Sequence, residues 1–169
     1  TRLVVIDPRR TPTAETADLH LPIAAGGDAA LFNLLLAETA RRGALDAAML
    51  ARSEGLEEAL AAANATDPAL TGLSPAQLAQ LYDLWFASPR AITAWSMGIN
   101  QSASGTDKVN AILNLHLATG RIGRPGMGPF SFTGQPNAMG GREVGGMANL
   151  LACHLDIENP AHRKAVQTF

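Results

Sequence analysis

Residues 95–146 read WSMGINQSASGTDKVNAILNLHLATGRIGRPGMGPFSFTGQPNAMGGREVGG, and this stretch decides how the rest of the chain is interpreted. Nine of the sixteen glycines in the chain lie in the part of this stretch that begins at Gly120. A glycine-dense segment of this length inside a compact domain is usually functional or disordered. Glycine lets the backbone approach a ligand closely, and amide and guanidinium side chains supply hydrogen bonds. The interleaved polar residues are Asn100, Gln101, Arg121, Arg124, Gln135, Asn137, Arg142 and Glu143.

A flexible linker is the alternative interpretation of this stretch. A linker would contain more serine and more charge, and less methionine, phenylalanine and valine, than these residues do. The composition therefore favours a binding segment over a linker.

Length and composition indicate one soluble globular domain with room for a core, because the chain has 169 residues, of which 47% are hydrophobic and 17% charged. A net charge of −2 and scattered basic residues argue against nucleic acid as a partner. No apolar run approaches the roughly 18 residues that a membrane-spanning helix requires. The single cysteine, Cys153, excludes an internal disulfide and a cysteine cluster, and we expect it to be buried in a helix.

Apolar runs separated by helical patterns predict an α/β fold with a doubly wound parallel sheet. Buried strands are expected at residues 2–6 and 91–95, because both runs are continuously apolar, with a further short strand at 19–23. Residues 97–105 are expected to form a loop at the carboxyl end of the strand at 91–95. The predicted helices cover residues 28–42, 46–53, 55–64, 75–86, 106–119 and 144–154, and a last one begins near residue 160.

Polar residues at two of these junctions suggest a nucleotide site. The loop after the first strand contains Asp7, Arg9 and Arg10, and Gly26 and Gly27 precede Asp28 at the start of a helix. Backbone amides at a helix start bind anions, and a carboxylate there can accept hydrogen bonds from a guanine edge or from ribose. The alternative interpretation involves no ligand: Asp28 only caps the helix, and Arg9 and Arg10 are solvated. The glycine and lysine fingerprints of NAD and ATP sites are missing.

The histidines are less informative. His116 lies on the amphipathic helix predicted at 106–119, and we expect it to be packed in the core rather than to act as a base. His20, His154 and His162 have no companions at metal-ligand spacing.

Three motifs carry a resemblance to a known family: WSMGINQ at 95–101, GTDKVNAILNLHLATGRIGRPG at 105–126 and TGQPNAMGGREVGG at 133–146. These motifs resemble the bacterial molybdopterin oxidoreductases, and within that family they are most similar to its assimilatory nitrate reductase branch. The similarity extends from residue 2 to about residue 165. Members of the family are several times longer than this chain, so the resemblance implies an internal fragment.

The resemblance implies a cofactor and the residues that contact it. Family members bind two molybdopterin guanine dinucleotides around one molybdenum, and a [4Fe-4S] cluster whose ligands would lie outside this fragment. Residues 1–119 would bind one guanine dinucleotide, and residues 120–169 would form a glycine-rich extension along the substrate funnel. The matching cofactor positions are Asp7, Pro8, Arg9, Arg10, Thr11, Gly26, Gly27, Asp28, Met97 and Gln101.

The resemblance also implies an activity, the two-electron reduction of nitrate to nitrite in the cytoplasm, with electrons from a donor protein or domain. Gln135, Arg142 and Glu143 would lie near the metal, and a guanidinium suits a planar anion that accepts paired hydrogen bonds. In the alternative, Arg142 only forms a salt bridge with Glu143. The residue that ligates molybdenum lies outside this sequence, so the fragment alone would be inactive.

Three other functions compete with this expectation. A formate dehydrogenase of the same superfamily would typically read GQNNVQG where this chain reads GQPNAMGG. A non-catalytic scaffold homologue would have no need of Gln101 or Arg142. A stand-alone binding module would not leave its glycine-rich loops without an evident partner.

Overall fold

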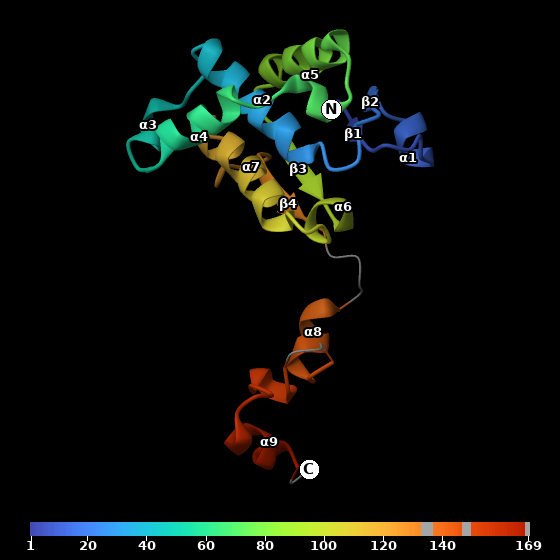
Figure 1. Cartoon of the computed structure of the whole chain (residues 1–169), viewed down its shortest axis with the longest axis vertical. Coiled ribbons are helices and arrows are strands. Elements are labelled where there is room, and N and C mark those ends of the chain that lie inside the picture. The colour runs from blue at the N-terminus through green and yellow to red at the C-terminus, as the bar shows by residue number, and fades with distance from the viewer. Residues whose placement is uncertain (133–136, 147–149, 168–169) are drawn as a thin grey trace. The chain divides into compact units, whose positions relative to one another are not determined.

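The computed structural model describes residues 1–132, 137–146 and 150–167. The chain divides into two compact units, Thr1–Ser131 and Phe132–Phe169 (Figure 1). Each unit is described by itself. None of the helices described has both the length and the apolar character that crossing a bilayer requires. Residues 120–131 belong to the first compact unit, and the functional division at 119/120 stays a prediction.

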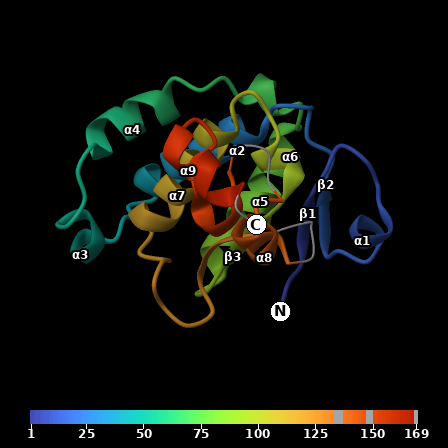
Figure 2. The same ribbon diagram turned by 90° about the horizontal axis from the view of Figure 1, so that it is seen from below.

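The first unit begins with a parallel strand pair. Strand β1 (Val4–Ile6) pairs with β2 (Leu19–Leu21), with Val5 opposite His20. The short helix α1 (Pro12–Glu15) joins them, and the three elements lie side by side (Figures 1 and 2). The positions of these two strands are predicted correctly to within two residues at each end, but β1 is half-buried rather than buried as expected.

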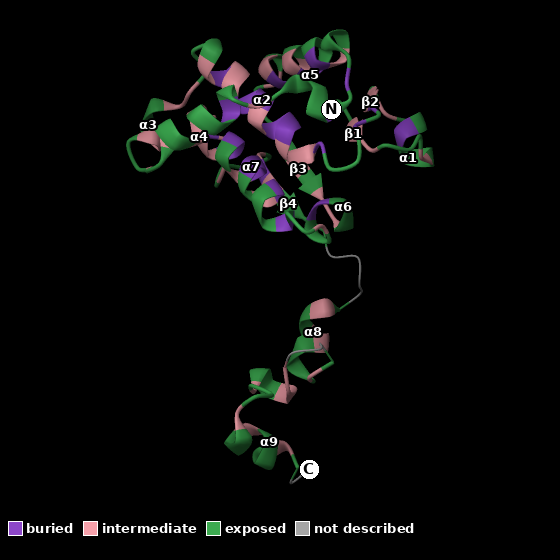
Figure 3. Ribbon diagram, in the orientation of Figure 1, coloured by how far each residue is buried: buried purple, intermediate pink, exposed green. Residues whose placement is uncertain are grey.

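Two long helices form the centre of the first unit. Helix α2 (Asp28–Arg41) packs against α7 (Gly105–Ala118), and Leu31, Leu35, Ile112 and Leu115 are at most 2% exposed. These residues recur at helical spacing, so each helix buries one mostly apolar face, and Figure 3 shows buried segments on both helices. The two helices therefore supply most of the framework that positions the loops at their ends.

Shorter helices surround this centre, namely α3 (Ala47–Leu50), α4 (Leu56–Asn64), η1 (Pro68–Thr71) and α5 (Pro75–Ala87). The start of α5 is fixed by its sequence, because Ser74 and Gln77 form a reciprocal capping box and Pro75 occupies the first turn. The prediction of this helix is confirmed.

A second parallel pair joins β3 (Ile92–Trp95) to β4 (Gly128–Ser131), with Ala94 opposite Phe130. Strand β4 lies within the glycine-rich stretch, where no strand is predicted. The prediction that β3 is buried is wrong, because Ile92 is 62% exposed; Phe130 of the paired strand β4 is likewise 55% exposed. Helix α7 contacts β4, and Thr93 of β3 hydrogen-bonds to α7, so the apolar side chains of the opposite face remain accessible.

The α/β class with parallel strands is confirmed. The four strands of the described residues form two separate pairs, β1–β2 and β3–β4, with helices between and beside them. Each strand is only three or four residues long, so most of the core is contributed by helices.

The second unit contains α8 (Ala138–Glu143), η2 (Ala152–His154) and α9 (Pro160–Val166). The predicted helix over 144–154 is wrong. Gly145, Cys153 and His154 have φ angles of 74°, 58° and 57°, and left-handed residues cannot continue a right-handed helix. Cys153 is exposed rather than buried, because it lies at this irregular turn.

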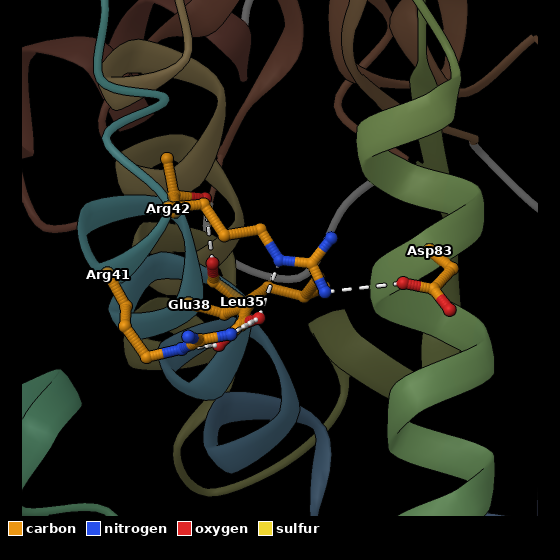
Figure 4. A network of polar contacts seen from close by, with 6 residues as sticks. Leu35, Glu38, Arg41, Arg42 and Asp83 are labelled. Atoms are coloured by element: carbon orange, nitrogen blue, oxygen red, sulfur yellow. Dashed lines mark hydrogen bonds and ion pairs between the residues drawn. The ribbon is translucent and has the colours of Figure 1, made fainter.

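An ionic network ties α2 to α5 (Figure 4). Glu38 accepts hydrogen bonds from Arg41 and from Nε of Arg42 (2.6 Å), and Arg42 reaches the carboxylate of Asp83 on α5 (3.2 Å). The Glu38 side chain is only 10% exposed. The hydrogen bond from Arg41 is the main reason that the pKa of Glu38 lies below its ordinary value.

Glu38→Gln is therefore expected to lower the free energy of unfolding by about 1 kcal/mol at pH 7. A carboxyl with a lowered pKa in the folded state contributes stability that is present above its unfolded pKa, near 4.5, and is lost as the pH falls through its folded pKa. Urea titrations at pH 7 and at progressively lower pH would measure this. Asp83→Asn, at an exposed position, serves as the control, and an equal loss in both variants would contradict the assigned role of Glu38.

Candidate functional site

The loops after β1 and β2 emerge from the same edge, because the two strands are parallel. The amide of Asp7 donates to the carbonyl of Leu21 (3.2 Å), and Nε2 of His20 lies 2.9 Å from the carbonyl oxygen of Asp7. The first predicted cofactor loop is thus fixed beside the end of β2. Ligands in open α/β folds bind at this carboxyl edge.

The loop that follows β1 has a fixed backbone and solvent-accessible arginine side chains. The carboxylate of Asp7 accepts from the amide of Arg9 (2.7 Å), and the hydroxyl of Thr11 accepts from the amide of Ala14 at the start of α1 (3.3 Å). Pro8 and Arg10 are exposed, and the Arg9 side chain is 84% exposed, with its guanidinium 3.8 Å from the Asp7 carboxylate. The loop therefore offers two accessible guanidinium groups on a constrained turn.

The glycines before α2 serve different purposes. Gly26 has a φ of 87°, and a Cβ there would meet nothing within 4 Å. A Cβ on Gly27 would lie 2.8 Å from the carbonyl oxygen of Leu70 and 3.1 Å from Cα of Thr71, so Gly27 permits close packing against η1. Gly26 supplies the left-handed backbone of a turn that borders open space, and Gly27 brings the turn against the core.

Helix α2 begins at Asp28 with no side-chain cap, and Gly27 holds the cap position. The prediction that Asp28 is the cap is therefore wrong, since it is the first helical residue. The first backbone amides of a helix lack acceptors within it, and together with the helix dipole they attract anions. This end of α2 has the chemistry of a phosphate site.

The carboxylate of Asp28 has a partner that the sequence analysis missed. Nζ of Lys108, on α7, lies 2.7 Å from Oδ2 of Asp28 and 3.5 Å from the carbonyl oxygen of Gly98. The Lys108 and Asp28 side chains are only 5% and 19% exposed. The position of Lys108 one helical turn before Ile112 indicates that this lysine is buried, but not which residue it pairs with.

The third predicted cofactor segment, residues 97–101, is not a plain loop, because Met97–Asn100 forms the helical turn α6. Ile99 is 7% exposed and anchors the turn, whereas Met97 is 47% exposed and Gln101 is also exposed. A Cβ on Gly98 would meet nothing within 4 Å. Through Lys108, this turn is joined to the start of α2.

The rest of α6 is fixed by hydrogen bonds to the β3–β4 pair. Nε1 of Trp95 donates to Oδ1 of Asn100 (2.9 Å), and Nδ2 of Asn100 donates to the hydroxyl of Ser131 (3.4 Å). A Cβ on Gly105 would lie 2.7 Å from the carbonyl oxygen of Asn100, so α7 begins in close contact with α6. Hydrogen bonds to the strands or to α7 thus hold each of the three predicted cofactor segments of the first unit.

The predicted catalytic residues lie in the second unit. Oε1 of Glu143 is 2.8 Å from Nε2 of His154, so Glu143 is paired with this histidine rather than with Arg142. Arg142 is exposed, and its guanidinium forms no ion pair with any residue of the described part of the second unit. Gln135 lies outside the described residues.

His116 is packed in the core, as predicted. It is fully buried, with Nδ1 2.9 Å from the carbonyl of Arg121 and Nε2 2.8 Å from the hydroxyl of Thr93. Because a carbonyl can only accept, Nδ1 carries the proton, and in the neutral ring Nε2 accepts from Thr93. Burial lowers the pKa of His116, which favours this neutral form.

Arg121, whose carbonyl bonds to His116, is itself held by contacts to the end of α5. Its guanidinium donates to the carbonyls of Trp85 (3.1 Å) and Ser88 (2.7 Å) and stacks over the Trp85 ring at 4.4 Å. Burial lowers the pKa of Arg121. These contacts give Arg121 a structural role at the end of α7.

The structure-described residues contain no group of three or more His, Cys, Asp or Glu side chains placed to hold a metal ion. What the first unit offers is a set of anion-binding and hydrogen-bonding groups.

Comparison with known proteins identifies relatives of this chain. The model of the family described as molybdopterin oxidoreductase matches residues 1–168. A nitrate reductase of Klebsiella oxytoca is 53% identical over 161 residues, which cover 93% of this chain and 18% of that protein. An assimilatory nitrate reductase of Haloferax mediterranei is 40% identical over 168 residues, covering 98% of this chain and 23% of the relative.

More distant similarities extend beyond nitrate reductases. The F420-dependent formate dehydrogenase 1 subunit alpha of Methanococcus maripaludis is 31% identical over 155 residues, covering 89% of this chain and 23% of that protein. Acetylene hydratase from Pelobacter acetylenicus has the same fold over 74% of this chain and 18% of its own, with a TM-score of 0.66 and 24% identity. The chain spans about a fifth of the length of each of these proteins.

Proposed function

The chain belongs to the molybdopterin oxidoreductase family, and we propose that it is part of the catalytic subunit of an assimilatory-type nitrate reductase. The observation that carries this proposal is the identity of more than half of the aligned residues with a nitrate reductase. The relative with formate dehydrogenase activity in its name is less similar, at 31% identity. The longer protein would reduce nitrate to nitrite with two electrons.

The cofactor implied by this family membership is a molybdenum bis-molybdopterin guanine dinucleotide. Three features of the first unit fit a guanine dinucleotide: the uncapped start of α2, the open space at Gly26 and Gly98, and the accessible guanidinium groups of Arg9 and Arg10. The start of α2 and the arginines would hold phosphate groups, because amides and guanidinium groups donate to phosphate oxygens.

Other residues of these loops would contact the remainder of the cofactor. The wall of the cofactor site would be formed by Asp7, Pro8, Thr11 and Gly27. Oδ1 of Asp28 would accept a hydrogen bond from a guanine edge or a ribose hydroxyl. Met97 and Gln101, both exposed on the α6 turn, would face the pterin end.

When bound, the metal and pterin would supply the oxygen-atom transfer and the two-electron chemistry. The chain itself would bind and orient nitrate through Arg142, whose guanidinium presents paired donors to a planar anion. Glu143 would be held by His154, and Gln135 would complete the wall of the funnel. The metal-ligand region and the [4Fe-4S] cysteines would lie elsewhere in the longer protein, so this chain alone would be inactive.

In the longer protein, Arg142→Ala is expected to raise the KM for nitrate about tenfold and to change kcat less, because it removes a binding contact rather than the redox centre. Arg142→Lys should recover only part of the affinity, since an ammonium cannot donate in a bidentate fork. Steady-state kinetics with a reduced dye would measure both.

The control for this prediction is Arg163→Ala, which removes an exposed arginine from α9 of the same unit. Its KM should match that of the wild type. An unchanged KM in Arg142→Ala would contradict the proposed role of Arg142.

The proposed reaction is tested by expressing the longer protein and comparing dye-linked reduction of nitrate with dye-linked oxidation of formate. Turnover of nitrate alone supports the proposal. Turnover of formate would move the protein to the dehydrogenase branch, and the absence of both activities and of molybdenum would indicate a non-catalytic scaffold. We place the enzyme in the cytoplasm, with a separate protein or domain as electron donor, on its similarity to an assimilatory enzyme.

A further inference from the structure

Lys108 is the most deeply buried cation of the described residues, with 4% of the residue exposed. It lies on α7 one turn before Ile112, a position that an apolar residue would normally occupy. A buried ammonium group is costly unless it is paired and hydrogen-bonded. Its position therefore requires an explanation in the contacts that it makes.

Those contacts join two segments that are 70 residues apart along the chain, since Asp28 and Gly98 are its two partners. Nζ of Lys108 lies 2.7 Å from Oδ2 of Asp28, in the first turn of α2, and 3.5 Å from the carbonyl oxygen of Gly98 in α6. Both partners belong to segments that the proposed function assigns to the cofactor. In the described part of the first unit, Lys108 hydrogen-bonds to both segments and so connects them directly.

We propose that Lys108 is a positioning residue of the cofactor site, holding the Asp28 carboxylate and the Gly98 turn in the arrangement that receives the guanine dinucleotide. The inference rests on the proposed function. Lys108 itself would not touch the cofactor, because its ammonium group is enclosed by its two partners and the core.

The ion pair between Lys108 and Asp28 also affects the backbone amides at the start of α2. A carboxylate in the first turn of an uncapped helix is attracted to the free amides of that turn. Without Lys108, Asp28 would be free to occupy the amides that a phosphate group should bind. The ion pair withdraws Oδ2 from those amides and leaves Oδ1 of Asp28 as the acceptor.

A purely structural role is the competing explanation, because removal of one partner from a buried ion pair destabilises a fold in any case. The two explanations differ in what the loss of Lys108 would change besides the stability of the fold. A positioning role predicts loss of cofactor beyond what the loss of stability produces, together with local loosening at residues 26–30 and 97–101.

Ile112→Ala provides a matched control. Ile112 is fully buried on the same helix, one turn from Lys108, and its truncation destabilises the core without removing a contact to Asp28 or Gly98. Lys108→Met removes the charge while keeping a similar length, and Lys108→Arg keeps the charge.

The test uses the full-length protein that contains this chain. Molybdenum and acid-released guanine nucleotide per polypeptide are measured for the wild type and the three variants, together with Tm and amide hydrogen exchange. Lys108→Met is expected to hold about tenfold less cofactor than Ile112→Ala at a comparable Tm, by analogy with the loss of affinity when groups that orient metal ligands are removed. Lys108→Arg should retain more cofactor than Lys108→Met, and exchange at residues 26–30 and 97–101 should accelerate in Lys108→Met but not in Ile112→Ala.

Equal cofactor content and equal exchange in Lys108→Met and Ile112→Ala, with a loaded wild type, would overturn this inference alone. A wild-type protein that carries neither molybdenum nor guanine nucleotide would overturn the proposed function, and the inference with it.

Discussion

Replacing Gly27 by valine is expected to lower the free energy of unfolding of the chain by about 3 kcal/mol, because side-chain atoms would be forced into a closely packed backbone. A Cβ at this position would lie 2.8 Å from the carbonyl oxygen of Leu70, and neither this oxygen nor Cα of Thr71, at 3.1 Å, belongs to a flexible side chain. The turn before α2 or the helical turn η1 would have to move. Equilibrium urea unfolding followed by circular dichroism measures the loss.

Two other glycines provide controls for Gly27→Val. Gly98→Ala should leave the stability nearly unchanged, because a Cβ there meets nothing and φ is not positive. Gly26→Ala should cost about 1 kcal/mol through its left-handed backbone alone. If Gly27→Val were as stable as Gly98→Ala, the packing of the turn against η1 would be contradicted.

His116→Ala is expected to lower the free energy of unfolding by about 3 kcal/mol near pH 8, because it leaves a cavity and removes two buried hydrogen bonds. The ring is fully buried, contacts the carbonyl of Arg121 and the hydroxyl of Thr93, and packs edge-on against Trp85 at 5.5 Å. Thr93→Val, which removes only one of these hydrogen bonds, should cost about 1 kcal/mol. Urea unfolding of both variants measures the two contributions.

The same histidine predicts a pH dependence. Its folded-state pKa lies below the ordinary value of 6.5, so the unfolded chain binds the proton more readily. The stability contributed by neutral His116 is therefore fully present above pH 6.5 and falls as the pH drops below 6.5 toward the folded pKa. His116→Ala should lose this part of the pH dependence. If the stability of His116→Ala fell between pH 6.5 and 5 as much as that of the wild type, burial of His116 would not be the cause of the pH dependence.

Much of the fold follows from local sequence signals. The apolar run before Asp7 predicts β1, and Ser74 followed by Pro75 predicts the start of α5, because the capping chemistry and the proline act within one helical turn. Strand β4 escapes prediction because Gly128 and Pro129 both disfavour strands, and only pairing with β3 fixes them. The predicted helix over 144–154 is wrong because the apolar composition of the segment gives no sign that Cys153 and His154 adopt left-handed backbone conformations.

The candidate site is predictable only in part. Residue chemistry alone indicates an anion site at the strand ends, and the family resemblance supplies the cofactor and the substrate. The partnership of Asp28 with Lys108 cannot be read from sequence, because the two residues are 80 positions apart and meet only when α2 packs on α7. For the same reason, the pairing of Glu143 with His154 instead of Arg142 depends on an irregular turn rather than on sequence proximity.

In the proposed function, three segments of the first unit, residues 7–11, 26–28 and 97–101, would together bind a guanine dinucleotide. The most direct measurement is amide hydrogen exchange of the full-length protein, purified with its molybdenum cofactor and again from cells that cannot make that cofactor. We expect slower exchange in the loaded protein at all three segments, and no change at helix α4, which serves as an internal reference. A loaded protein whose exchange at these three segments equals that of the empty protein would contradict the claim.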